Sequence, residues 1–381
     1  MYTPSFFSLA LLASSVTAQM SLSQAIAGNI DTLSTLSMLL GQQPALVRAL
    51  SNSSSGITVL APSNAAFTKF LAEPANKAAA GQSDVVAAIL QYHVLNGNFP
   101  ASKFTMEPQF IPTLLTNESY TQVTGGQVVQ VALDGSNAVV TTGLKETSMT
   151  TMTDIMFTGG VMHIVDTVLT IPISPSMSAI DSNLLSLAGA LTDTSLVEPV
   201  DSLKDVTIFA PTNEAFEKIG NTAAALPMAQ LSQILEYHVI NGTVGYSTLL
   251  TSGLANESFP TLMGQSLTVT SEDSKVFINS AQVITTDIIV SNGVMHVIDN
   301  VLNPSNSTIV EDPTAVSQPI AFEGATSAAS APFTSGITAT TTAPSAATGT
   351  SNKMGAGERL AGGEGLGGVL AAVVGVAVVL L

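Results

Sequence analysis

Three sequence blocks occur twice in this chain, in the same order, and they limit its fold more than any other feature. The pairs are 57–67 and 206–216 (ITVLAPSNAAF and VTIFAPTNEAF), 89–97 and 234–242 (ILQYHVLNG and ILEYHVING), and 160–169 and 293–302 (GVMHIVDTVL and GVMHVIDNVL). The copies lie 149, 145 and 133 residues apart. Solenoid repeats have periods of about 20 to 50 residues, so this spacing indicates two duplicated domains instead. The falling offset predicts longer connections in the first copy.

Each copy has the same predicted order of helices and strands. The first block predicts a buried strand that ends at a proline, after which Ser63 or Thr212 caps a short helix. The second block follows a helix-like run and ends in Asn-Gly, which is a turn signal. An alternating, β-rich stretch comes next, and the third block predicts a closing strand over 161–169 and 294–302. This order predicts the α+β class.

Charge and composition exclude several classes of function. The formal net charge is −17 and no run of Lys or Arg occurs, so neither nucleic acid nor a heparin-type polyanion is expected as a partner. The chain has no cysteine, which excludes disulfides, thiolate metal sites and cysteine nucleophiles. The Gly-x-Ser-x-Gly, His-Glu-x-x-His and P-loop motifs of common enzymes are absent. We therefore predict a non-catalytic protein without a cofactor.

Both ends of the chain carry the patterns of a secreted, lipid-anchored protein. An apolar stretch over 6–16, followed by a small-residue cleavage pattern, predicts a signal peptide over 1–18. The last 13 residues, 369–381, are apolar but too few to span a bilayer, which takes about 20. Small residues at 355–357 and a polar spacer precede them, so we predict GPI attachment at Gly355 and removal of 355–381. A short tail anchor or a buried strand is the alternative.

Between the second domain and this tail, the composition changes. The stretch 326–351 consists mainly of Ser, Thr, Ala, Gly and Pro without a charge. Such a composition cannot bury a core and is typical of O-glycosylated stalks. We predict a disordered stalk over 304–354 that holds the domains away from the membrane.

The repeated blocks resemble the three signatures of the fasciclin (FAS1) domain family. The resemblance covers about 21–170 and 177–303, and all three signatures occur twice in order. It implies two wedge-like β-sandwiches decorated with helices, displayed outside the cell, with roles in adhesion or matrix assembly. The family includes GPI-anchored surface proteins of fungi and plants, which the stalk and tail here resemble.

The resemblance also implies candidate contact residues in each domain. They match the family's Tyr-His and Asp-Ile elements, namely Tyr92, His93, Asp154 and Ile155 in the first copy and Tyr237, His238, Asp287 and Ile288 in the second. An exposed Asp suits integrin-type recognition, because its carboxylate can complete the coordination of a metal ion held by the receptor. The alternative is that both aspartates cap a turn while the isoleucines pack inward.

All four histidines lie in the repeated blocks: His93, His163, His238 and His296. A functional interpretation pairs them as metal or acid–base sites, with Asp166 or Asp299 as further ligands. The alternative, which we favour, is structural: each imidazole binds backbone or Tyr groups inside its domain. We therefore predict no metal site, and no catalytic residue.

Five N-glycosylation sequons fit an ectodomain, at Asn52, Asn117, Asn241, Asn256 and Asn306. Asn117 and Asn256 are expected at matching places in the two copies. Asn241 directly follows the second Tyr-His block, whereas the first copy has Asn96-Gly97-Asn98 there. A glycan at Asn241 would screen its surroundings, so we expect the Tyr-His face of the first domain to be the more accessible one.

Together these features predict a secreted surface glycoprotein that mediates adhesion or matrix contact. The expected partner is a cell-surface or matrix protein or glycan, with self-association left open, and the membrane is reached through a GPI lipid. An accessory role in membrane fusion or at the vacuolar membrane is the alternative. A metal-dependent enzyme is the third class.

Overall fold

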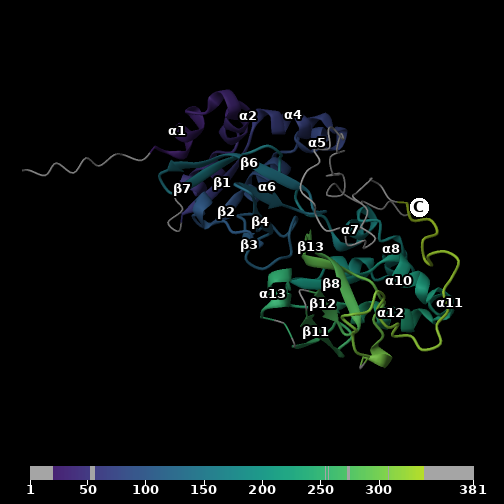
Figure 1. The fold of residues 1–381 in the computed structure, drawn as a ribbon. Coiled ribbons are helices and arrows are strands. Elements are labelled where there is room, and N and C mark those ends of the chain that lie inside the picture. The colour runs from purple at the N-terminus through teal and green to yellow at the C-terminus, as the bar shows by residue number, and fades with distance from the viewer. Residues whose placement is uncertain are drawn as a thin grey trace, which may run out of the picture.

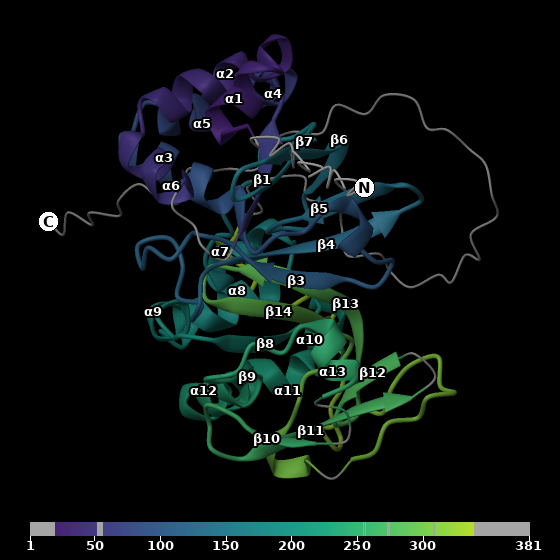
Figure 2. The same cartoon turned by 90° about the vertical axis from the view of Figure 1, so that its left-hand side faces the viewer.

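A computed structural model describes residues 20–51, 56–253, 255, 257–272, 275–307 and 309–338 of the chain. The predicted signal peptide and the anchor segment lie outside these residues. Figures 1 and 2 show two domains, the first in purple and blue and the second in teal and green. Each combines a sheet with a set of helices, as the α+β prediction required.

In the described part of the first domain, seven strands form one sheet in the order β2-β1-β7-β6-β5-β4-β3. Their bounds are β1 (Ile57–Pro62), β2 (Val94–Asn96), β3 (Gln109–Pro112), β4 (Val128–Asp134), β5 (Asn137–Thr141), β6 (Thr147–Phe157) and β7 (Gly160–Val165). β1 and β7 pair in parallel from Ile57 opposite Gly160 to Pro62 opposite Val165. The first and third repeated blocks therefore lie side by side at the centre of the domain.

The sheet folds back on itself. The long strand β6 pairs with β5 on one side and β7 on the other, so it belongs to both halves of the sheet. At the far edges, Leu95 in β2 bridges Thr113, which directly follows β3. The two halves enclose a core between them, which is the sandwich that the family resemblance implied.

The second domain repeats this order as β10-β11-β12-β13-β14-β8-β9 over the residues described. The bounds are β8 (Val206–Pro211), β9 (Val239–Ile240), β10 (Ser258–Pro260), β11 (Ser266–Glu272), β12 (Lys275–Ile278), β13 (Ala281–Val290) and β14 (Gly293–Ile298). Thr261 bridges Ile240 here, as Thr113 bridges Leu95 in the first domain. Both closing strands end four residues earlier than predicted, because the chain after Val165 and Ile298 turns away toward a histidine described below.

Helices pack against the sheet of each domain. In the first domain they are α1 (Leu22–Ala27), α2 (Ile30–Gly41), α3 (Pro44–Ser51), α4 (Asn64–Ala72), α5 (Pro74–Ala79), α6 (Ser83–Tyr92) and the 3-10 helix η1 (Ala101–Lys103). In the second they are α7 (Pro175–Asp181), α8 (Leu185–Asp193), α9 (Val197–Asp201), α10 (Asn213–Lys218), α11 (Gly220–Ala225), α12 (Met228–Tyr237), α13 (Ser247–Thr251) and η2 (Pro304–Asn306). The predicted N-caps are confirmed: Ser63 accepts a hydrogen bond from the Ala66 N–H and Thr212 accepts one from that of Ala215.

The two domains contact one another through an insertion that only the first domain has. In both domains a Thr hydroxyl donates to a Gln carbonyl across the base of the same loop, from Thr113 to Gln127 and from Thr261 to Gln265. Thirteen residues (114–126) lie between these partners in the first domain and three (262–264) in the second. The longer connection predicted from the falling offset is therefore located here.

This insertion and its neighbours bind the second domain directly. The Gln127 side chain donates to the carbonyl of Val290 at 3.0 Å, and the Gln122 N–H donates to that of Ser291 at 2.8 Å. Thr124 donates from its N–H and its hydroxyl to the carboxylate of Asp205 at 2.7 and 2.5 Å. Figure 2 shows β3 of the first domain next to β13 and β14 of the second.

The predicted start of the disordered stalk at residue 304 is wrong. Residues 309–338 run along the second domain, as the yellow chain in Figure 1 shows, and Ala321 and Phe322 are buried there. Composition alone suggested a free stalk, because Ala, Ser and Gly-rich segments rarely supply enough apolar surface to pack. The rest of the predicted stalk, 339–354, lies outside the described residues.

Candidate functional site

The tyrosines of the two Tyr-His elements lie in the domain cores. Tyr92 and Tyr237 are both 0% exposed and stand at the C-terminal ends of α6 and α12. The Tyr92 hydroxyl donates to the carbonyl of Val128 at 2.9 Å, and that of Tyr237 donates to Ser266 at 3.0 Å. Each tyrosine thus fastens the end of a helix to the first residue of a strand, β4 or β11.

The adjacent histidines are also buried. The Leu169 N–H donates to Nε2 of His93 at 2.9 Å, so Nε2 carries no proton and Nδ1 donates to the carbonyl of Ile89 at 2.7 Å. His238 makes the same two contacts, with Leu302 and Ile234, at the same distances. In each domain the imidazole thus joins the C-terminal end of the helix to the segment that follows the closing strand.

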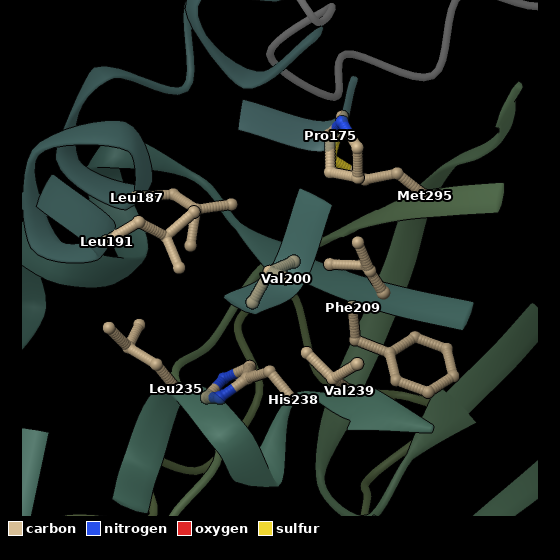
Figure 3. A pocket seen from close by; sticks show the side chains of 10 residues that line it. Pro175, Leu187, Leu191, Val200, Phe209, Leu235, His238, Val239 and Met295 are labelled. Carbon is tan, nitrogen blue, oxygen red and sulfur yellow. The ribbon is translucent and has the colours of Figure 1, made fainter. Parts of the chain in front are cut away.

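Burial keeps these imidazoles neutral. It lowers the pKa of His93 and of His238 to about 4 from 6.5, because a charged ring would lose its hydration, although the backbone carbonyl bound to each ring opposes the shift. Figure 3 shows His238 among Leu191, Leu235 and Val239, beside an apolar void of about 10 Å³. That volume is at the lower limit for one water molecule, so no ligand site adjoins this ring.

The predicted Tyr-His contact surface is therefore wrong for these side chains. Tyr92, His93, Tyr237 and His238 are at most 2% exposed, so none of them can reach a partner at the surface. The sequence pattern that marked them, a polar pair within an apolar run, identified groups whose hydrogen bonds are satisfied inside the core. The expected difference in accessibility between the two Tyr-His faces does not arise.

His163 and His296 form a second pair of internal contacts. The Asp154 N–H donates to Nδ1 of His163 at 3.3 Å, and Nε2 of the same ring donates to the carbonyl of Phe99 at 2.8 Å. His296 binds the Asp287 N–H at 3.2 Å and the Gly245 carbonyl at 2.8 Å. Burial lowers the pKa of both rings, while the bonded carbonyl and the nearby aspartate act in the opposite direction.

These histidines hold the Asp-Ile elements in an unusual backbone conformation. Asp154 and Asp287 both have φ of 60°, in the left-handed region that non-glycine residues seldom adopt. Both lie where the pairing of β6 with β7, and of β13 with β14, shifts register. Such a bulge turns a side chain out of the strand. Because they share this φ and this register shift, the two elements have the same local fold.

The surroundings of the two aspartates differ completely. Asp154 is exposed and Ile155 is half-buried, and the carboxylate accepts a hydrogen bond from the Ala101 N–H at 2.8 Å. Asp287 is 2% exposed and Ile288 is 4% exposed, and the carboxylate accepts one from the Ser247 N–H at 2.7 Å. Both aspartates therefore cap a short helix, as the alternative interpretation expected, but only Asp154 also faces solvent.

The first domain covers Asp287. Gly143, in the turn after β5, forms a bridge with Ile289 two residues from Asp287. Lys145 in the same turn lies close enough to Asp287 that the carboxylate offsets part of the fall in the Lys145 pKa caused by burial. Phe110 on β3 stacks on Tyr246, with ring centroids 4.1 Å apart and planes at 11°. The interdomain contact thus closes over the second Asp-Ile element.

Comparison with known proteins agrees with this duplicated geometry. The family model of the fasciclin domain matches residues 31–172 and 182–304. The chain belongs to the fasciclin domain family. A fasciclin-like arabinogalactan protein of Arthroderma benhamiae is 34% identical over 335 residues, which is 87% of this chain and 78% of that protein. A second protein of that description, elcF of Phaeosphaeria nodorum, is 28% identical over 71% of this chain and 85% of its own length.

More distant fasciclin proteins match smaller parts. The transforming growth factor-beta-induced protein ig-h3 of Sus scrofa is 34% identical over 151 residues, 38% of this chain and 21% of that protein. A solved FAS1 domain pair from the insect cell adhesion molecule fasciclin I aligns with 74% of this chain and 100% of its own, at 18% identity and a TM-score of 0.35.

No group of three or more metal-ligating side chains occurs within the described parts of either fasciclin domain. The ring nitrogens of all four histidines contact backbone groups instead. In the same residues, no helix is both long and apolar enough to cross a membrane.

The sequons fall into different environments. Asn117 and Asn241 are exposed, whereas Asn306 is half-buried and its Nδ2 donates to the carbonyl of Ala321 at 3.1 Å. The expected match between Asn117 and Asn256 is wrong, because Asn117 follows β3 inside the insertion while Asn256 precedes β10, the counterpart of β3. Asn52, Asn256 and the predicted anchor site Gly355 lie outside the described residues.

Sequence reasoning missed the residues that join the two fasciclin domains. Phe110, Gln127, Asp205 and Tyr246 make the contacts, and none stands in a repeated block that drew attention to it. The signal was the unequal length of the two copies. A segment that only one copy needs is a candidate for contact with the other.

Proposed function

We propose that this protein is a non-catalytic glycoprotein of the cell surface or cell wall, and that it mediates adhesion through the first fasciclin domain. The contact would be made by the bulge that carries Asp154 and Ile155. The observation that supports this most directly is the difference between the two copies: Asp154 is exposed, whereas Asp287 is covered by the first domain. The second domain then serves as the support on which the first is mounted.

Hydrogen bonds within the first domain hold the Asp154 bulge in place in the unbound protein. The Asp154 N–H is held by His163 and its carboxylate by the N–H of Ala101. A contact residue that is already ordered loses less conformational entropy on binding than a flexible one does. Exposed apolar side chains lie on the same strand, at Met149, Met152 and Met156, and would add apolar contact area around the carboxylate.

The chemistry of this bulge favours a partner with cationic character. An exposed carboxylate can complete the coordination of a divalent cation that a partner protein or an acidic glycan holds, and a net charge of −17 attracts cationic partners at long range. The relatives described as fasciclin-like arabinogalactan proteins support the glycoprotein part of the proposal. The family match and the internally bonded histidines support a role without catalysis.

The test compares the attachment of cells, or of extracted wall material, to the immobilised full chain and to two variants. Asp154→Asn removes the charge at the bulge, and Asp134→Asn removes a charge from the exposed end of β4 in the same domain. We expect Asp154→Asn to raise the protein concentration needed for half-maximal attachment about tenfold or more, as loss of a central charged contact does, and Asp134→Asn to leave it unchanged. Equal attachment by wild type and Asp154→Asn would refute the proposed contact site.

Location is tested separately. Phosphatidylinositol-specific phospholipase C should release the protein from intact cells if a GPI lipid replaces the segment after Gly355. Recovery of the tagged protein at the vacuolar membrane would instead favour the accessory role in fusion. A mature protein that retains the peptide ending in Leu381 would contradict the anchor.

A further inference from the structure

Residues 309–338, which we call the C-terminal strap, follow the second domain closely although the segment contains neither helix nor strand. Gln318, Ala321 and Phe322 are at most 8% exposed. Ile309, Ala325, Phe333 and Ile337 pack against the apolar core of the domain. The rings of Phe333 and Phe216 meet edge to face with centroids 6.1 Å apart. The strap therefore adds side chains to the core of this domain.

The domain binds the backbone of the strap along most of its length. Side chains of the domain donate to strap carbonyls, namely Lys275 to Pro313 at 2.7 Å, Asn300 to Pro319 at 3.0 Å, Asn303 to Ala321 at 3.0 Å and Ser186 to Pro332 at 2.8 Å. Between these points, the Ala328 N–H donates to the carbonyl of Glu217 at 3.0 Å. Bonds to carbonyls need no particular side chain on the strap, which explains how a low-complexity sequence can dock specifically.

From Phe322 to Ala331, every third residue of the strap faces the domain. Phe322 is buried and Ala325, Ala328 and Ala331 are half-buried, while the pairs between them, 323–324, 326–327 and 329–330, are exposed. A period of three is that of an extended chain with three residues per turn. The inward positions are apolar, and the exposed ones include Ser327 and Ser330, so sugars on these hydroxyls would point away from the domain.

Two glycines in the second domain make room for the strap. A methyl group at Gly189 in α8 would overlap the carbonyl of Phe333, and one at Gly220 in α11 would overlap Ala328. The corresponding positions of the first domain carry larger side chains. Asn64 accepts from the Thr35 N–H as Asn213 accepts from that of Ser186, so Met38 corresponds to Gly189, and Met38 is 58% exposed.

Gly220 also corresponds to a larger residue in the first domain. Phe67 and Phe216 occupy the same place in the repeated first block, so Leu71, four residues on, corresponds to Gly220. Leu71 is 37% exposed. Glycine inside a helix, as Gly189 is in α8, is less favourable than alanine by about 1 kcal/mol, whereas Gly220 is the first residue of α11. The two glycines thus mark a docking site that only the second domain has.

We propose that the C-terminal strap is a constitutive part of the second fasciclin domain, docked through the site formed by Gly189, Gly220 and Phe216. The chain then leaves the domain beside α8, where Phe333 sits, and not from the end of β14. This inference concerns the folding of the second domain and does not depend on the adhesive role. Its consequence for a tethered protein is that the pull of the tether enters the domain through the strap.

The experiment uses the full chain with Gly189→Ala and, as a matched control, Gly41→Ala. Gly41 ends α2, the counterpart of α8, and a methyl group there would meet nothing within 4 Å. If the strap is docked, Gly189→Ala lowers the melting temperature of the second domain and speeds chymotryptic cleavage after Phe322 and Phe333 about tenfold or more, because cleavage follows the population of the open form. Gly41→Ala changes neither.

If the strap is not docked, the change in melting temperature should have the opposite sign. Without a docked strap, Gly189→Ala would raise the melting temperature, since alanine is the better helix former. Unchanged cleavage together with an equal or higher melting temperature would overturn the proposal. Phe333→Ala serves as the second variant if Gly189→Ala fails to fold. It should speed cleavage after Phe322 by a similar factor, and cleavage at the wild-type rate would likewise overturn the proposal.

Discussion

The imidazole of His163 accepts a hydrogen bond from the N–H of Asp154 at 3.3 Å, and this bond connects the core of the first domain to an exposed carboxylate. Because Nε2 of the same ring is bound to Phe99, the imidazole bridges the loop after the Tyr-His element and the bulge of β6. His296 does the same beneath Asp287. The histidines thus act as positioning residues in both domains.

Stability should fall in mild acid. The folded-state pKa of His93 and of His238 is about 4, below the ordinary value of 6.5, so the unfolded chain binds protons first as the pH falls. The stabilisation is complete above pH 6.5 and is lost progressively as the pH falls toward 4. Each domain should lose about 2 kcal/mol between pH 7.5 and pH 5. Urea unfolding at a series of pH values measures this, and His93→Gln should flatten the slope for the first domain.

Removing either buried histidine should destabilise its own domain. His93→Ala leaves the buried Leu169 N–H without its partner and removes the imidazole from the Ile89 carbonyl, and His238→Ala does the same at Leu302 and Ile234. A buried polar group left unsatisfied costs about 1–3 kcal/mol, measurable by urea unfolding with domain-specific probes. Metal analysis of the purified full chain is the companion measurement, and stoichiometric zinc or copper would contradict the structural role.

The stacked pair Phe110 and Tyr246 should couple the two domains energetically. An aromatic pair contributes about 0.5–1.5 kcal/mol beyond its buried area, and a double-mutant cycle with Phe110→Ala and Tyr246→Ala isolates that coupling. The control cycle combines Tyr246→Ala with Phe67→Ala, because α4 lies on the side of the first domain away from the junction (Figure 2). We expect the control coupling to be near zero. A coupling near zero for Phe110 and Tyr246 as well would mean that the domains are joined by the other contacts.

The sequons should differ in occupancy. Asn117 and Asn241 are exposed and should carry glycans, whereas Nδ2 of Asn306, the atom to which a glycan is attached, is bound to Ala321 of the strap. Glycopeptide mass spectrometry of the mature protein should find Asn306 unmodified. A fully occupied Asn306 would show that this bond does not form in the secreted protein.

The sequence by itself determined the number of domains and the strands and caps of the repeated blocks. These follow from local rules, since a proline ends a strand and a Ser or Thr side chain caps the helix that begins after it. The duplication of the Asp-Ile element is also visible in the sequence, and in the structure both aspartates have the same φ of 60°.

Only the tertiary structure decided which of the duplicated residues reach solvent. His93 lies in an apolar run, which predicts a core position. A residue next to a contact surface can also lie in such a run, so local spacing cannot separate the two cases. Asp154 and Asp287 have the same neighbours in sequence, and they differ because the first domain packs against one of them. The strap is the reverse case. Its composition predicts no core, and it is ordered because backbone carbonyls bind side chains such as Asn303 that fold beside it. Burial of this kind depends on segments distant in sequence, which no local pattern records.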